Sequence, residues 1–252
     1  MLISHEVPKT LLTESLNFND YDYFLIHQIT RHPEYRDFFF LTKDLGRRSI
    51  LDNSLYELKE SFDPDVFADF VRELRPSEYL IPDCFNNYDK NMDMFDDWMV
   101  KYGSLPGTKI ATVHGSSIED FENAYAAFDA AGVKIAFNFA ESLYSQLGNP
   151  IAARFGVISS LSINPSRKHH LLGCTVPQEF LMYRDMKFIE TIDTSNPIMA
   201  AFEGKRYPVA SKPKLAVDDC QSIDVTERIR ADIYYNTSVF KKYLRERYEG
   251  EI

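Results

Sequence analysis

The chain has 252 residues, of which 44% are hydrophobic and 26% charged, a composition ordinary for a soluble globular protein. Its net charge of −10 and isoelectric point near 5.1 argue against broad, non-specific nucleic-acid binding, because the phosphate backbone favours basic surfaces. No apolar run approaches the roughly 20 residues that a membrane span needs. The N-terminus also lacks the apolar segment of a secretory signal.

The cysteines exclude two further classes of protein. Cys84, Cys174 and Cys220 are odd in number, lie far apart and form no CxxC pair. They therefore predict neither a disulfide framework nor a cysteine zinc site. This usage fits a reducing cytoplasm, and we expect no metal and no other cofactor.

Apolar runs of strand length recur along most of the chain. Residues 1–20 are weakly patterned and are interpreted as an N-terminal extension. We expect strands near residues 22–27, 37–42, 49–53, 78–82, 109–114, 134–138, 169–173 and 188–193. The links between the first three runs are short, so full helices are not expected there.

Helical segments separate the later runs. Asp63-Pro64 is typical of a helix start, and Ser117 and Gly132 are expected to begin and end another helix. From the third run onward, strands and helices alternate, which predicts a parallel sheet. Eight strands within about 170 residues predict one (β/α)8 barrel domain spanning residues 1–252, with irregular first units and a C-terminal helix near 224–248.

Polar residues follow many of the predicted strands. They are Asp52, Asp83, His114, Asn138, the Gly173-Cys174 turn and Asp193. In a parallel barrel the carboxyl ends of all strands share one rim, so these groups are expected to meet in one mouth. Taken singly, each is typical of a turn or a helix cap. Their coincidence indicates a site.

Two carboxylates that face each other across a pocket permit a division of labour. One, kept ionised, attacks an electrophilic carbon, and the other, with a raised pKa, gives and takes a proton. That chemistry is related to the retaining glycosidases. The same pair of carboxylates leaves open an alternative, a barrel hydrolase in which Asp52 and Asp193 act on a sugar substrate.

The most informative stretch runs from Lys168 to Phe180. His169-His170-Leu171-Leu172 reads as a short buried strand that stops at Gly173. Thr175 is expected to cap the next helix, with Pro177 in its first turn and Gln178 closing a capping box. Residues 171–179 resemble the Y-L-M-G-V-G-T-P-E-D pattern of the tRNA-guanine transglycosylases, and in particular of their short phage relatives that place 7-deazaguanines in DNA.

Other strand ends extend the resemblance over residues 49–196. Leu51-Asp52-Asn53-Ser54 is similar to the T-D-S-G-G motif, which implies Asp52 as the acid/base and Tyr56 as a base contact where the glycine pair is replaced. Ile192-Asp193 stands where the family has its nucleophilic aspartate. The resemblance also implies that Asp83, His114, Asn138 and the Gly173-Cys174 turn bind the base.

The resemblance implies a base exchange without a metal or redox cofactor. Guanine in DNA would be replaced by a free 7-deazaguanine, with the 7-cyano form as first candidate, and the target base must be flipped out of the stack. Tyr56, Phe137 or Tyr144 would stack on that base. Basic segments at Arg167, Lys168, Lys205 and Arg206 would hold phosphates beside the mouth, although each alone is typical of a solvated face.

Two departures from the family pattern bear on the substrate. The family's zinc site of three cysteines and a histidine has no counterpart after Asp193, and the chain is far shorter than the tRNA enzymes. Both departures favour the branch that modifies DNA, with a tRNA-directed enzyme as the alternative. The missing glycines and the histidine at position 114 leave open a non-catalytic barrel that binds a purine.

Overall fold

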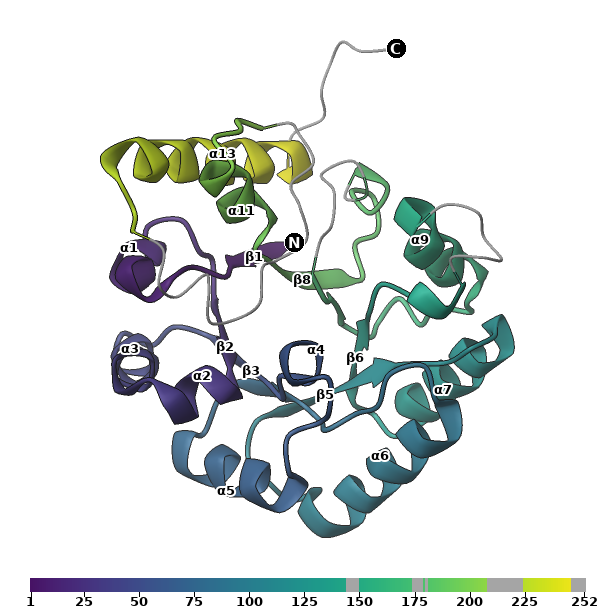
Figure 1. Cartoon of the computed structure of the whole chain (residues 1–252). Helices are drawn as coiled ribbons and strands as arrows, with labels where there is room; N and C mark the ends of the chain where they lie inside the picture. Colours follow the sequence, from purple (N-terminus) through teal and green to yellow (C-terminus); the bar gives the residue numbers. More distant parts are fainter. Residues whose placement is uncertain (144–149, 174–178, 180, 208–223, 246–252) are drawn as a thin grey trace, which may run out of the picture.

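Eight parallel strands form a nearly closed barrel surrounded by helices (Figure 1). The structure, a computed structural model, describes residues 1–143, 150–173, 179, 181–207 and 224–245. The strands are β1 (Leu2–His5), β2 (Asp22–Leu25), β3 (Ser49–Asp52), β4 (Glu78–Leu80), β5 (Thr108–Val113), β6 (Lys134–Phe137), β7 (His169–Leu171) and β8 (Ile189–Thr194). The predicted (β/α)8 barrel is confirmed.

Helices follow most of the strands and cover the outside of the barrel (Figure 1). They are η1 (Lys9–Leu11), α1 (Leu12–Ser15), α2 (Ile26–Arg31), α3 (Pro33–Asp44), α4 (Leu55–Leu58), α5 (Pro64–Leu74), α6 (Tyr88–Tyr102), α7 (Ile118–Ala130), η2 (Glu141–Leu143), α9 (Pro150–Ser160), α11 (Asn196–Phe202) and α13 (Glu227–Arg245). Short α4 lies over the centre of the barrel, and α13 packs against α11.

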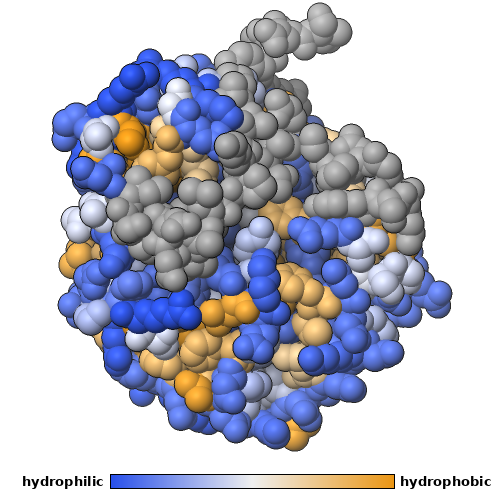
Figure 2. All heavy atoms as spheres, in the orientation of Figure 1, coloured by the Kyte–Doolittle hydropathy of each residue, from blue (hydrophilic) through white to orange (hydrophobic). Residues whose placement is uncertain are grey.

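Local sequence explains where several helices begin. The side chains of Asp63, Asn87 and Ser117 accept hydrogen bonds from the first turns of α5, α6 and α7, and Ser117 forms a full capping box with Asp120. The apolar faces of these helices pack on the outer face of the sheet. Figure 2 shows that hydrophilic residues cover most of the visible outer ring, with smaller apolar areas among them.

The first two units differ from the sequence prediction. Residues 37–42 belong to helix α3, because Pro33 begins a helix whose Tyr35, Phe38, Phe39 and Thr42 face the core at helical spacing. The first strand is instead Leu2–His5, within the segment interpreted as an extension; it pairs with β8. The expectation of no full helix before β3 is also wrong, since α3 has 12 residues.

The barrel has a seam between β1 and β2, which are the two ends of the hydrogen-bonded strand order. Side chains bridge this seam. The Asn19 side chain binds both the N–H and the C=O of His5, the Asp20 carboxylate accepts from the Ile3 N–H, and the Ser4 hydroxyl accepts from the Tyr23 N–H. Side-chain hydrogen bonds therefore take the place of strand pairing between β1 and β2.

Candidate active site at the carboxyl rim of the barrel

Asp52 and Asp193 occupy the same rim, at the carboxyl ends of β3 and β8. Two stacked rings lie between them inside the barrel. The Tyr23 hydroxyl donates to Asp52, the His170 ring contacts Asp193, and the two rings stack with centroids 5.7 Å apart and an interplanar angle of 12°. Asp52 and Asp193 are therefore connected through these two rings at one rim, and that they face each other across a substrate pocket stays a prediction.

Asp52 sits in surroundings that favour its protonated form. Burial raises the pKa of Asp52 well above its ordinary value, and the charges of Glu57 and Asp193 act in the same direction. The hydrogen bonds from the Tyr23 hydroxyl and the Ser54 N–H oppose the shift and leave the pKa raised. A carboxyl group with a raised pKa is suited to give and take a proton.

Asp193 sits in different surroundings. Its side chain is buried, and its Oδ1 accepts hydrogen bonds from His170 Nε2 at 3.0 Å and from the Gly173 N–H at 3.1 Å. Two N–H donors on one carboxylate oxygen stabilise the ionised form. The surroundings of the two aspartates therefore differ: Asp52 has a raised pKa, whereas Asp193 accepts two N–H hydrogen bonds on one oxygen.

A second group of predicted residues continues around the rim. Asn138 Nδ2 lies 2.5 Å from His114 Nδ1, so this nitrogen accepts and the His114 Nε2–H donates to Asp83 Oδ2 at 2.8 Å. Asp83 Oδ1 accepts from Asn53 Nδ2 at 2.8 Å. The three base-binding candidates therefore lie together, and each carboxylate oxygen of Asp83 has one hydrogen bond already.

The turn after β7 supports Asp193. Gly173 has φ +62°, and its carbonyl accepts from Arg154 of α9 at 3.1 Å. Arg154 is buried, pairs with Glu179 and also binds the carbonyls of Phe137 and Leu172. The Gly173 N–H donates to Asp193 and so is not free to donate to a base edge, which differs from the expectation that the Gly173 backbone binds the base. The Gly173 carbonyl keeps a second lone pair beside the bond from Arg154.

Four expected aromatic and turn residues have different outcomes. Tyr56 is 40% exposed on α4, with the Lys59 ammonium 4.3 Å from its ring centre, so it lies on the helix over the barrel. Phe137 is buried outside the mouth, stacked on His169 and Tyr125, and the prediction that it stacks on a base is wrong. Cys174 and Tyr144 lie outside the described residues.

The expected phosphate contacts do not gather at the mouth. Arg167 and Lys168 directly precede β7, at the opposite rim of the barrel, and Arg167 pairs with Asp129. Lys205 pairs with Glu203, and Arg206 pairs with Asp232. His169 and His170, which follow Arg167 and Lys168 in the chain, are buried, and burial lowers the pKa of both.

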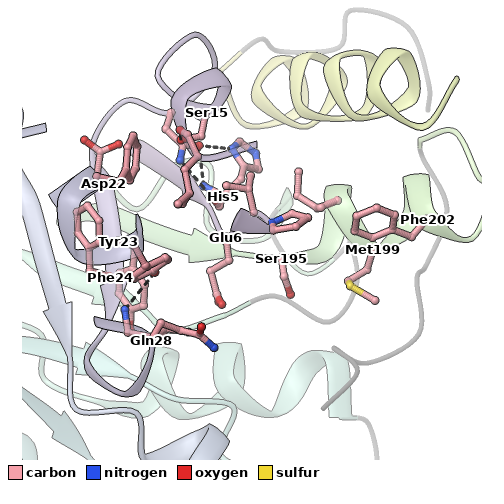
Figure 3. Close-up of a pocket in the computed structure, with 18 residues that line it drawn as sticks. His5, Glu6, Ser15, Asp22, Tyr23, Phe24, Gln28, Ser195, Met199 and Phe202 are labelled. Atoms are coloured by element: carbon pink, nitrogen blue, oxygen red, sulfur yellow. Dashed lines mark hydrogen bonds between the residues drawn. The ribbon is translucent and has the colours of Figure 1, made fainter. Parts of the chain in front are cut away.

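A pocket opens at the barrel seam beside this centre (Figure 3). Residues of the mouth and of the seam line it, among them Glu6, Tyr23, Gln28 and Ser195. Gln28 is buried, and its Oε1 has no hydrogen-bond partner among the residues that the structure describes. Tyr23 connects this pocket with Asp52, whereas Asp52, Asp83 and Asp193 do not line it. This pocket was not predicted from the sequence, because it depends on β1 and on the seam between β1 and β2, and neither was predicted.

Tyr23 and His170 were missed as site residues. Both lie on strands that the sequence predicts, at positions facing the barrel interior. Alternation along the strand would have revealed them, since Tyr23 is two residues from Leu25, and His170 two from Leu172. A polar aromatic residue within an otherwise apolar strand is the signal that was available.

No protein-family model matches the chain, and none of the curated proteins matches it significantly. The resemblance to the transglycosylases therefore rests on the motifs and on the positions of their residues. In the described part of the chain, no group of three or more His, Cys, Asp or Glu side chains is arranged to hold a metal ion. No helix there is long and apolar enough to cross a membrane.

Proposed function

We propose that this chain is a base-exchange transglycosylase that replaces guanine in DNA with a 7-deazaguanine, the 7-cyano form being the first candidate. One observation carries the proposal. Two carboxylates share the mouth of a (β/α)8 barrel in unlike surroundings, Asp52 with a raised pKa and Asp193 with two N–H donors on one oxygen. Cleavage and re-formation of a glycosidic bond uses such a pair.

The reaction proceeds in two balanced steps. The Asp193 carboxylate attacks C1′ of the target nucleotide, the bond from C1′ to the guanine nitrogen breaks, and Asp52 gives its proton to the departing base. The incoming 7-deazaguanine then loses a proton to Asp52, and its nitrogen displaces Asp193 from C1′. Atoms and protons balance over the cycle, and the enzyme returns to its starting state.

Base recognition is proposed for the group formed by Asp83, His114 and Asn138. A carboxylate oxygen has two lone pairs, so each Asp83 oxygen can accept a further hydrogen bond beside those from Asn53 and His114. Donors on a guanine edge complement such acceptors. Tyr56 on α4 provides a ring for stacking on the flipped base.

The proposal predicts that labelled guanine or 7-cyano-7-deazaguanine enters DNA in the presence of the wild-type protein. Asp193→Asn abolishes incorporation, because the amide cannot form the covalent ester. Asp97→Asn, which changes an exposed carboxylate on α6, is the matched control and keeps wild-type incorporation. Equal incorporation by Asp193→Asn would remove the nucleophile assignment, and label in tRNA alone would move the substrate from DNA to tRNA.

A non-catalytic purine-binding barrel is the second candidate. This candidate is favoured because Asp83, His114 and Asn138 are already hydrogen-bonded to one another, as side chains with a structural role are. A melting temperature that rises with added base, without any exchange into DNA or tRNA, would support this candidate.

A further inference from the structure

Beneath the aspartate pair, at the amino-terminal end of the barrel, lies a partly buried ionic network that the proposed function does not use. Its members are Arg48, Glu78, Lys134 and Glu190, named here the basal network. Burial alone would raise the pKa of Glu190, but Arg48 and Lys134 lower it to about 2. Arg48 and Lys134 thus stabilise the ionised form of Glu190.

One member of the basal network reaches toward the mouth. Lys134 Nζ is within hydrogen-bond distance of three acceptors, Glu78 Oε2 at 2.7 Å, Glu190 Oε2 at 3.1 Å and Thr191 Oγ1 at 2.9 Å. An ammonium group donates and never accepts, so Thr191 Oγ1 is the acceptor in the third contact. The hydroxyl proton of Thr191 is then available to another acceptor.

That acceptor is His170. Its Nδ1 lies 2.9 Å from Thr191 Oγ1, and its Nε2 lies 3.0 Å from Asp193 Oδ1. Because Thr191 uses its only proton toward Nδ1, this nitrogen accepts, and the ring proton of a neutral histidine must sit on Nε2. The Nε2–H then donates to Asp193, so the direction of every hydrogen bond from Lys134 to Asp193 is determined.

Burial and charge support a neutral ring. His170 is fully buried, and burial lowers its pKa well below the ordinary value; the positive charges of Lys134, Arg154 and Arg48 add to the effect, and Glu78 opposes it. The stacked Tyr23 ring limits rotation of the imidazole. A neutral donor orients a carboxylate without forming an ion pair that would weaken its oxygen as a nucleophile.

We propose that Lys134, Thr191 and His170 form a relay of hydrogen bonds that holds His170 as the neutral Nε2–H tautomer and aims this N–H at Asp193. His170 is then a positioning residue for the proposed nucleophile. The inference rests on the proposed function in that Asp193 is taken as the attacking group, whereas the tautomer itself is a property of the free protein.

The test compares Thr191→Val with Thr191→Ser in protein labelled with 15N histidine. Nitrogen NMR of the wild type is expected to show the His170 ring with Nε2 protonated and Nδ1 unprotonated at neutral pH, the signal being assigned by its loss in His170→Gln. Thr191→Ser keeps the hydroxyl and this pattern. Thr191→Val removes the hydroxyl, and the His170 ring is then expected to show more than one protonation pattern instead of Nε2–H alone.

The same variants are then assayed for base exchange. Thr191→Val is expected to lower kcat about tenfold to a hundredfold, the range for a hydrogen bond to a charged group, with KM changed by less than about threefold. Thr191→Ser is expected to keep the wild-type kcat, and melting curves establish that each variant is folded. If Thr191 had only a structural role, Thr191→Val would not lower kcat while leaving KM nearly unchanged.

Two outcomes are distinguishable. A wild-type His170 that carries its proton on Nδ1, or on both nitrogens, overturns the relay even if base exchange is active. An Nε2–H tautomer that depends on Thr191, in a protein that exchanges no base, supports the relay as a structural feature and contradicts the proposed function instead.

Discussion

At the scale of single residues, the proposed chemistry depends on the different surroundings of two aspartates. Asp52 has a pKa raised by burial and by the negative charges near it, while Asp193 is held by N–H donors. If Asp52 must be protonated when guanine leaves, activity is present below its raised pKa and is lost as the pH rises through it. The direction is opposite to that expected for an essential ionised base.

Tyr23→Phe tests this pH dependence. The Tyr23 hydroxyl lowers the pKa of Asp52 through its hydrogen bond, so removing the hydroxyl raises that pKa further. The alkaline limb of the rate against pH is expected to move to higher pH. Tyr102→Phe is the matched control, because the Tyr102 hydroxyl donates to the exposed Asp65 on the outside of the barrel. An alkaline limb that moves to lower pH, or equally in both variants, would exclude Asp52 as the titrating acid.

Asp52→Asn addresses the same role directly. An amide cannot donate a proton in the way a carboxylic acid does, and the loss of a general acid typically costs about 10²–10⁴-fold in rate. Base exchange is expected to fall by that factor, measured as initial rates of label incorporation. Binding of free 7-deazaguanine is expected to persist, because recognition is proposed for the group around Asp83. Near-normal turnover in Asp52→Asn would assign the proton to another residue.

At the scale of elements, the tight turn after β7 carries one partner of Asp193. A Cβ at Gly173 would stand 2.7 Å from Phe139 Cζ, and the residue has φ +62°. Gly173→Ala is therefore expected to lower the free energy of unfolding by about 2–4 kcal/mol and to weaken base exchange. Gly132→Ala is the matched control, since Gly132 has φ +76° with no atom within 4 Å of the added Cβ.

The control isolates the backbone strain from the clash. Gly132→Ala is expected to cost only about 1 kcal/mol, with base exchange unchanged. Urea unfolding gives the stability difference, and the labelled-base assay gives the activity. Similar losses of stability and activity in the two variants would mean that the packing of Phe139 does not determine the turn.

Elements also mark the limit of prediction from the sequence. Strands followed by a polar residue and a capped helix were predictable, because each carries an apolar run, a turn and a cap within a few residues. Residues 37–42 were misassigned because three consecutive phenylalanines look like a strand; Pro33 and the spacing of the buried residues indicate a helix instead. Strand β1 has only four residues and is defined by pairing with β8, in which each partner lies 189 positions away, as in Leu2 with Thr191; no local pattern reveals such a pairing.

The candidate site was predictable in part for the same reason. Strand-end residues such as Asp52 and Asp193 follow from the shared rim of a parallel barrel. Tyr23 and His170 point inward from the middle of strands, and their importance appears only when the barrel brings their rings together. The phosphate contacts were predicted from charge alone, and charge does not say at which rim a residue lies.

At the scale of the whole molecule, buried histidines make stability depend on pH. Burial lowers the pKa of His5 and His169 from about 6.5 to about 4, and that of His170 well below its ordinary value. The unfolded chain then binds more protons than the folded one between pH 6.5 and pH 4, so stability falls as the pH falls through that window. The raised pKa values of Asp52 and Asp22 offset part of the loss.

The expected loss is about 2 kcal/mol at pH 5 for each histidine whose pKa moves from 6.5 to 4. His5→Asn is expected to reduce the difference in unfolding free energy between pH 7 and pH 5 by about that amount, even where it lowers stability at pH 7. Urea unfolding at the two pH values measures the difference. A variant with the wild-type pH difference would show that His5 is not a source of the acid sensitivity.

The central claim is that Asp193 becomes covalently joined to the sugar of the target nucleotide. It is tested most directly by quenching the protein with labelled DNA in acid, separating protein-bound label on a denaturing gel and identifying the modified peptide by mass spectrometry. The account predicts DNA-linked peptide containing Asp193 in the wild type and in Asp97→Asn, and none in Asp193→Asn. A linkage at another residue, or base exchange that continues in Asp193→Asn, would contradict it.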